Sequence, residues 1–164
     1  MQGTIVQVNI SPRGLPKRAV SGGFCTPLGM EGDLHAHPQI HGGPRKALLL
    51  IASEVVEELQ AAGYPVFWGA MGENLTMRGI DVRRLRIGDR IRAGGALIEI
   101  TQPRGPCSAL DIYGETLGRA IYDKQVKALD HTSPRWGMSG FYASVVEAGP
   151  IGVSDIIAVV AQLA

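Results

Sequence analysis

The residue best suited to chemistry in this sequence is Cys107, which follows an apolar run and a Pro-Arg-Gly-Pro segment. Residues 96–101 alternate as in a strand, and the two prolines end it because proline has no N–H for a neighbouring strand. A short helix is predicted over 108–113, with Cys107 in its first turn, where free N–H groups and nearby Arg104 favour a thiolate. Such a thiol can be a nucleophile, a sulfur carrier or a soft-metal ligand. The alternative is a small buried side chain beside a tight turn.

A second group of candidate binding residues forms a glycine-rich segment with a histidine and two cations. Two adjacent glycines let the backbone approach a ligand closely, and the flanking side chains add donors and positive charge. Such a loop could hold an oxyanion or a phosphate, or it could be a turn with solvated cations. The residues concerned are His41, Gly42, Gly43, Arg45 and Lys46.

Glu73 and Asn74 lie between glycine and apolar residues, so the pair is predicted to be partly buried. A buried carboxylate needs hydrogen-bond partners. Glu73 could orient His41 or accept backbone N–H groups. A turn-stabilising role and a site role therefore both remain open for this pair.

The elements that must position these residues are mostly short strands. Hydrophobic alternation and turn residues predict strands over 4–10, 18–20, 46–52, 139–147 and 156–160, with a strand, turn and strand over 85–95. One helix is predicted over Ser53–Ala62, capped by Ser53, and a second over Glu115–Leu129, with Tyr122, Val126 and Leu129 on one face. Many short strands with few βαβ units favour an α+β domain that is mainly β and barrel-like, with two or three helices.

Composition limits the classes of protein that fit. The chain has 164 residues, 45% hydrophobic and 19% charged, with a net charge of +1. This fits a single domain over 1–164 and gives no electrostatic case for nucleic-acid binding. Two cysteines make no disulfide framework, no signal peptide is visible, and no apolar run is long enough to cross a membrane. We therefore expect a cytoplasmic protein without a membrane partner.

The order of the motifs resembles the MOSC domain, the module named for the C-terminal domain of molybdenum cofactor sulfurase. The similarity runs from about residue 3 to residue 160. Two departures are Met71, where many relatives have phenylalanine, and Ser154 before Asp155. The matching motifs are Gly32-Asp33, His41-Gly-Gly-Pro44, Gly72-Glu-Asn-Leu-Thr76, Ile87-Gly-Asp89, Gln102-Pro-Arg-Gly-Pro-Cys107 and Gly140-Phe-Tyr142.

This resemblance implies a β-barrel with a few peripheral helices. It also implies that Cys107 corresponds to the family's cysteine, which ligates molybdenum in members that reduce N-hydroxylated compounds and has been proposed to carry sulfur in sulfurase-type members. The expected cofactor is the molybdenum cofactor, with Cys107 as catalytic residue and metal ligand. By charge and backbone freedom, the candidate cofactor-binding residues are His41, Gly42, Gly43, Arg45, Lys46, Glu73, Asn74 and Arg104.

The resemblance also sets expectations about partners. A small-molecule substrate is expected, with either an electron-donating reductase or a sulfur donor. A cofactor-binding module without catalysis of its own is the third option, so whether the chain is an enzyme stays open, as does its oligomeric state. The chain has no room for the desulfurase domain of full sulfurases, so pyridoxal phosphate is not expected. It has no room either for the N-terminal barrel domain of mitochondrial amidoxime reductases, so part of a cofactor pocket could be missing or be supplied by a second subunit.

Overall fold

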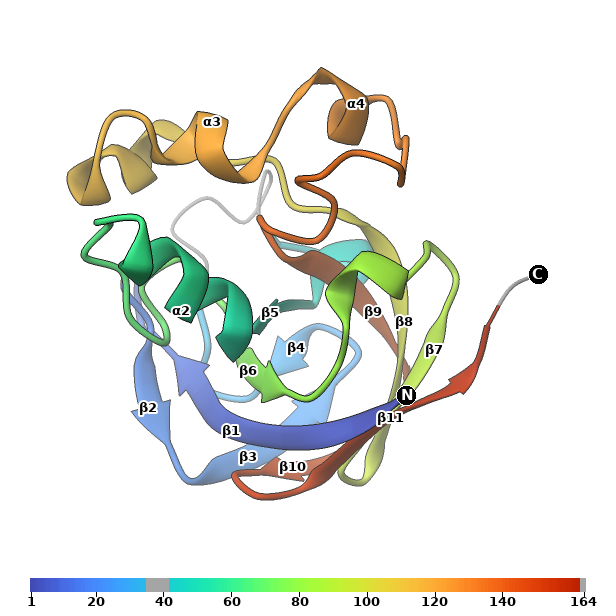
Figure 1. Cartoon of the computed structure of the whole chain (residues 1–164). Helices are drawn as coiled ribbons and strands as arrows, with labels where there is room; N and C mark the ends of the chain where they lie inside the picture. Colours follow the sequence, from blue (N-terminus) through green and yellow to red (C-terminus); the bar gives the residue numbers. More distant parts are fainter. Residues whose placement is uncertain (35–41, 163–164) are drawn as a thin grey trace.

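Seven strands close into a barrel in the computed structural model, which describes residues 1–34 and 42–162. Their order around the barrel is β11-β7-β8-β9-β5-β6-β1, and pairing of β1 with β11 closes the ring (Figure 1). All neighbours are antiparallel except β5 and β6, and β2 extends the sheet beside β1. The predicted mainly-β, barrel-like α+β class is therefore confirmed. The strands are β1 Gln2–Ile10, β2 Arg18–Val20, β5 Leu48–Ala52, β6 Leu75–Arg78, β7 Arg90–Ala93, β8 Ala96–Pro103, β9 Phe141–Glu147 and β11 Ile156–Ala161.

A second, three-stranded sheet in the order β10-β3-β4 was not predicted. Its strands are β10 Gly149–Gly152, β3 Gly22–Thr26 and β4 Gly29–Met30. Their glycines hide the usual alternation of strand residues, yet they permit the close approach of the two backbones. A Cβ at Gly22, for example, would lie 2.6 Å from the carbonyl oxygen of Ile151.

Helix α2, Ser53–Ala61, follows β5 directly and buries Val55, Val56 and Leu59 against the barrel. Its exposed glutamates lie on the opposite face, as the amphipathic pattern predicts. The predicted cap is wrong by one position. Ala52 occupies the N-cap, and Ser53 is the first helical residue and makes no capping hydrogen bond.

The predicted helix over 115–129 is two short helices, α3 Leu117–Ile121 and α4 Lys124–Lys127. Tyr122 between them is extended, and the Asp123 carboxylate accepts from the Val126 N–H at 2.8 Å to start α4. An acidic side chain that caps a new helix competes with continuation of the first one. Leu129 has a positive φ and is 52% exposed, so its predicted place on one helix face is also wrong.

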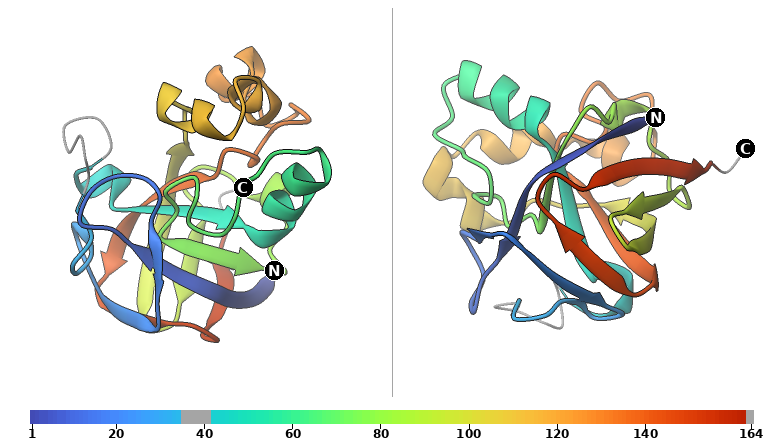
Figure 2. Two further views of the ribbon diagram at one scale, coloured as in Figure 1. Left: turned by 90° about the vertical axis from the view of Figure 1, so that its left-hand side faces the viewer. Right: turned by 90° about the horizontal axis from the view of Figure 1, so that it is seen from below.

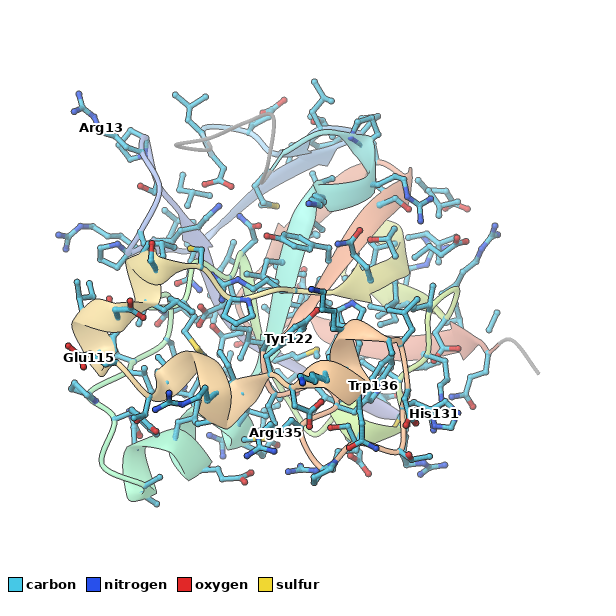
Figure 3. The ribbon with its side chains drawn as sticks, turned by 90° about the horizontal axis from the view of Figure 1, so that it is seen from above. Arg13, Glu115, Tyr122, His131, Arg135 and Trp136 are labelled. Carbon is cyan, nitrogen blue, oxygen red and sulfur yellow. The ribbon has the colours of Figure 1, made fainter. Side chains whose placement is uncertain are left out.

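The segment between β8 and β9 carries these helices and lies across one end of the barrel (Figure 2). It begins with the short 3-10 helix η3, Ser108–Tyr113, where a short helix was predicted. Figure 3 looks down on this end and labels several of its side chains. Among them, Trp136 is buried against the ring of Phe141 and donates its indole N–H to the carbonyl of Leu85 at 2.8 Å.

The stretch before β7 also differs from its prediction as a strand. A 3-10 helix, η2, spans Val82–Arg84, and Asp89 then closes a turn by accepting from the Arg86 N–H at 2.8 Å. β7 starts only at Arg90, although the turn before it is already bonded to β8: the Gly88 N–H donates to the Ile100 carbonyl at 2.8 Å, and the Ile100 N–H donates to the Asp89 carbonyl at 3.0 Å. Within the described residues, no helix is both long and apolar enough to cross a bilayer.

Candidate functional site

A pocket of about 230 Å³ lies where the loops after β1, before β6 and after β8 meet. Loops held on a rigid barrel are common places for binding residues. None of its lining residues is Asp or Glu within the part of the chain that the structure describes. The lining comprises three cations (Lys17, Lys46 and Arg104), three other polar or thiol residues (Asn74, Cys107 and Tyr142), six apolar residues (Leu15, Leu34, Leu49, Met71, Ala109 and Ile112), and the two glycines Gly14 and Gly72.

Cys107 lines this pocket as a free, partly exposed thiol. It occupies the N-cap of η3 rather than the first turn that the sequence predicts, and it makes no capping hydrogen bond. The other cysteine, Cys25, is also free but fully buried, and burial raises its pKa to about 11. Of the two thiols, Cys107 is therefore the one that a molecule in the pocket can reach.

Arg104 is a buried cation in the wall of the same pocket, with 3% of its surface exposed. Its backbone N–H is tied to the carbonyl of Gly140 at 2.9 Å. Its Nε and Nη1 have no hydrogen-bond partner among the described residues. A buried guanidinium with unsatisfied donors is costly, so an acceptor in the pocket would stabilise it.

Tyr142 connects Arg104, Cys107 and Lys46. Burial raises the pKa of the Tyr142 phenol, and the nearby Cys107 raises it further. The positive charge of Arg104 and a side-chain hydrogen bond from Arg104 both lower this pKa. The ammonium of Lys46 lies 5.3 Å from the centre of the Tyr142 ring. Two cations and a thiol therefore gather around one aromatic side chain.

Asn74 lines the pocket but uses its side chain to hold the walls together. Its Oδ1 accepts from the Leu49 N–H at 3.1 Å, and its Nδ2 donates to the Asn9 carbonyl at 3.2 Å and to Asp33 at 2.8 Å. These bonds connect the start of β5, the end of β1 and the loop that contains Asp33. The sequence leaves open a turn-stabilising role and a site role for Asn74. The observed hydrogen bonds show a structural role.

Glu73 is completely buried behind the pocket wall and does not line the pocket. Its Oε1 accepts from the Gly69 N–H at 2.6 Å and from the Thr76 hydroxyl at 3.3 Å, while its Oε2 has no partner among the described residues. Burial raises the pKa of Glu73 to about 6, although these hydrogen bonds and the charge of Arg104 oppose the rise. Glu73 therefore holds the loop before β6 and interacts electrostatically with Arg104 in the pocket wall.

Lys17 and Asp33 form an ion pair with side chains only 5% and 2% exposed. Burial lowers the pKa of Lys17, and Asp33 opposes that effect. Asp33 also accepts from the Ser11 N–H at 2.9 Å, and the Lys17 N–H donates to the Gly69 carbonyl at 2.9 Å. The pair fixes the β1–β2 loop, which forms one wall of the pocket.

The structure brings together four of the predicted site residues, Lys46, Asn74, Arg104 and Cys107, in one pocket. It does not place Gly42, Gly43 or Arg45 in the lining, and His41 lies outside the described residues. Residues 44–46 form a 3-10 helix, η1, instead of an open loop, and the Arg45 carbonyl accepts from the Thr101 hydroxyl at 2.6 Å.

Sequence reasoning missed Lys17, Tyr142 and the apolar wall. Tyr142 lies in a matching motif, Gly140-Phe-Tyr142, which is the one signal that could have found it. A lone lysine between proline and arginine gives no such signal. Among the described residues, no group of three His, Cys, Asp or Glu could hold a metal ion. The described part of the site therefore offers one thiol and three cationic side chains.

Comparison with known proteins gives consistent matches. The family model described as MOSC domain matches residues 37–158. Protein YiiM of Escherichia coli (strain K12) is 30% identical over 161 residues, which cover 93% of this chain and 66% of YiiM. The uncharacterized protein YflK of Bacillus subtilis (strain 168) is 34% identical over 124 residues, 74% of this chain and 51% of YflK. The chain thus spans just under two thirds of one relative and about half of the other.

A solved structure agrees with these sequence matches. The crystal structure of YiiM from Geobacillus stearothermophilus superposes with a TM-score of 0.72 at 27% sequence identity, and the match covers 98% of this chain and 76% of that one.

Proposed function

Because the chain belongs to the MOSC domain family, we propose that it binds the molybdenum cofactor in the pocket at Cys107 and that this thiolate is the protein ligand of the metal. Family membership makes this the cofactor to test. The observation that carries the proposal is the single free, partly exposed thiol in a pocket whose described lining holds cations and no carboxylate. A thiolate is a soft ligand of the kind that suits a single protein bond to such a metal.

The donor set of the pocket fits this group. The molybdenum cofactor is anionic, and Arg104 has buried nitrogens that lack an acceptor. Lys46 adds a second cation at the same wall. Charge-assisted hydrogen bonds from such groups to an anion are stronger than those between neutral groups. Cys107 would hold the metal, and Arg104 and Lys46 would hold anionic parts of the bound group.

The remaining lining residues shape the site and keep water out. Leu15, Leu49 and Met71 form an apolar wall, and the hydrogen bonds of Asn74 hold that wall in register with the barrel. When bound, the cofactor would supply the oxygen-transfer chemistry that reduces an N-hydroxylated compound to the amine and water with two electrons and two protons. The electrons would come from a partner reductase.

A sulfur-carrier role is the second candidate, and the contrast between the two cysteines favours it as well. Cys107 is free and partly exposed at a pocket, whereas Cys25 is buried. A persulfide on Cys107 would form by transfer of a sulfane sulfur from a donor to the thiolate, and the adduct would remain reachable by an acceptor.

Metal and sulfur analysis of protein made in a host that synthesises the cofactor separates these roles. We expect molybdenum and pterin to copurify with the wild type and with Cys25→Ala, and to be absent from Cys107→Ser that keeps the wild-type melting temperature. Cyanide-labile sulfur without molybdenum would instead support the carrier role. Undiminished molybdenum in folded Cys107→Ser would overturn the ligand assignment, and undiminished cyanide-labile sulfur in the same variant would overturn the carrier role.

A further inference from the structure

We propose that an apolar rim beside Cys107, formed by Leu34, Ala109 and Ile112, binds an apolar group of the substrate, so that compounds with an aryl or branched alkyl substituent are preferred over small polar ones. This deepens the proposed function, because it names the class of substituent that the substrate carries. It rests on that function for the reaction alone, since the rim consists of this chain's own side chains and can be tested without the cofactor.

The first observation is how η3 directs its side chains. A 3-10 helix has three residues per turn, so residues three positions apart lie one above the other on the same face. Leu110 and Tyr113 form one such face and pack into the core. Ala109 and Ile112 form the next face, and both line the pocket while remaining exposed. The helix therefore presents an apolar stripe to the opening of the pocket.

This stripe begins at the thiol. Cys107 is the N-cap of η3, and a 3-10 helix rises about 2 Å per residue, so Ala109 and Ile112 follow Cys107 by about 4 Å and about 10 Å along the helix axis. Ser108 and Asp111, on the third face of η3, are exposed and do not line the pocket. A substituent of a molecule bound at Cys107 would therefore extend along apolar rather than polar side chains.

The second observation is the difference in depth between the polar and the apolar parts of the pocket. Ile112 is 72% exposed and Leu34 is 60% exposed, so these two side chains lie at the mouth. Arg104, Tyr142 and Asn74 are buried and lie deep in the pocket. The proposed function assigns the anionic cofactor to the deep, polar part, which leaves the mouth to the substrate.

The third observation is that every exposed residue of the described lining is apolar. These residues are the three of the rim, and the other lining residues are buried or half-buried. Single exposed apolar side chains are normal on a protein surface, but a group of them around a concave pocket is typical of a ligand site. Because the rim borders a pocket that opens beside a thiol, we assign it to a substituent of a small molecule rather than to a protein.

Two maleimides that differ in one substituent test the rim in cofactor-free protein. N-phenylmaleimide and N-methylmaleimide form the same carbon–sulfur bond, by addition of the Cys107 thiolate to the double bond and uptake of a proton from water. The phenyl-to-methyl ratio of their rate constants cancels the fraction of thiol that is ionised, so it reports contact with the substituent. Peptide mass spectrometry measures both rates, with N-acetylcysteine as the free-thiol reference.

We expect the phenyl-to-methyl ratio at Cys107 to exceed that of N-acetylcysteine by about fivefold, which is the effect of burying about 40 Å² of apolar surface. Ile112→Ser should lower this excess to about twofold, and Ile112→Ser combined with Leu34→Ser should bring the ratio close to the reference. Ile156→Ser is the matched control, because this isoleucine on β11 is 58% exposed and does not line the pocket. It should leave the ratio at Cys107 unchanged.

A wild-type ratio equal to that of N-acetylcysteine would overturn the inference, and so would a full excess that survives in the folded double variant. A wild type that sediments as a dimer and becomes monomeric in Ile112→Ser would assign the rim to a second copy of the chain and refute it as well. The wild-type comparison needs no variant, so a variant that fails to fold does not protect the proposal.

The proposed function fails separately from this inference. Loss of the phenyl preference leaves the expected molybdenum content of the loaded protein unaffected. Conversely, a chain that keeps the phenyl preference but never binds molybdenum would refute the proposed function alone.

Discussion

Glu73→Gln should remove a pH-dependent penalty on the stability of the fold. Glu73 is fully buried, and burial raises its pKa from 4.5 to about 6 although Arg104 opposes the rise. Its charge also acts on Lys17 and Tyr113, so it faces two cations and a phenol. Glutamine keeps the oxygen that accepts the Gly69 N–H and replaces the oxygen that has no partner.

The sign of the effect follows from proton binding. Below pH 4.5 the carboxyl is protonated in both states; between 4.5 and about 6 the unfolded chain loses its proton first, so stability falls as the pH rises. Above that range the loss is complete, and a rise of this size in the pKa corresponds to about 2 kcal/mol. The difference in unfolding free energy, wild type minus Glu73→Gln, should therefore decrease by about that amount from pH 4 to pH 7.

Urea denaturation of both proteins across this pH range measures the difference, and groups common to both cancel. Glu115→Gln, which removes an exposed carboxyl, is the matched control. A difference that stays constant with pH would refute the reasoning. A difference that grows in favour of the wild type would mean that attraction to Arg104 and Lys17 outweighs the desolvation of the carboxylate.

Three further outcomes follow from the packing around the pocket. In the native protein iodoacetamide should modify Cys107 well before Cys25, which is buried, and peptide mapping that finds Cys25 modified first would contradict this. Gly72→Ala should lower the unfolding free energy by about 1–3 kcal/mol, because φ at Gly72 is +88° and an added Cβ would overlap a methyl group of Leu15 in the β1–β2 loop. An unchanged urea midpoint in this variant would disprove the prediction. Lys17→Met should cost about 3–5 kcal/mol by leaving Asp33 buried without its cation, and Lys17→Met combined with Asp33→Asn should recover part of that loss.

The barrel could be predicted because its main strands carry strong local signals. The alternation of β1, the apolar run of β5 and the β-branched residues of β8 and β11 favour strands without help from the rest of the chain. This approach could not find β3, β4 and β10. These strands contain glycines where two backbones approach closely, and glycine gives no alternation of apolar and polar side chains. The break at Tyr122 was also hidden, because it depends on the capping bond of Asp123 to Val126.

The residues of the candidate site also fall into those that local sequence motifs predict and those that they do not. Cys107, Arg104, Lys46 and Asn74 belong to short motifs, so their types and order indicated a site before their positions were known. Whether a residue in such a motif lines the pocket depends on the direction of its side chain. Glu73 and Asn74 are adjacent, yet Glu73 is buried away from the pocket and Asn74 lines it.

Lys17 and Tyr142 show the limit of local sequence patterns more clearly. Lys17 meets Asp33 across 16 positions, and Tyr142 meets Arg104 from the next strand of the barrel. Such contacts arise only when distant segments fold together, so neither residue could be assigned to the pocket from its immediate neighbours.

The most direct test of the account is the reactivity of Cys107 as a function of bound molybdenum. Preparations loaded to different extents with cofactor are treated with iodoacetamide, and mass spectrometry gives the fraction of Cys107 modified in each. If Cys107 is the metal ligand, this fraction should fall in proportion to the molybdenum bound per chain and return to completeness after denaturation. Full modification of Cys107 in folded protein that carries stoichiometric molybdenum would contradict the account.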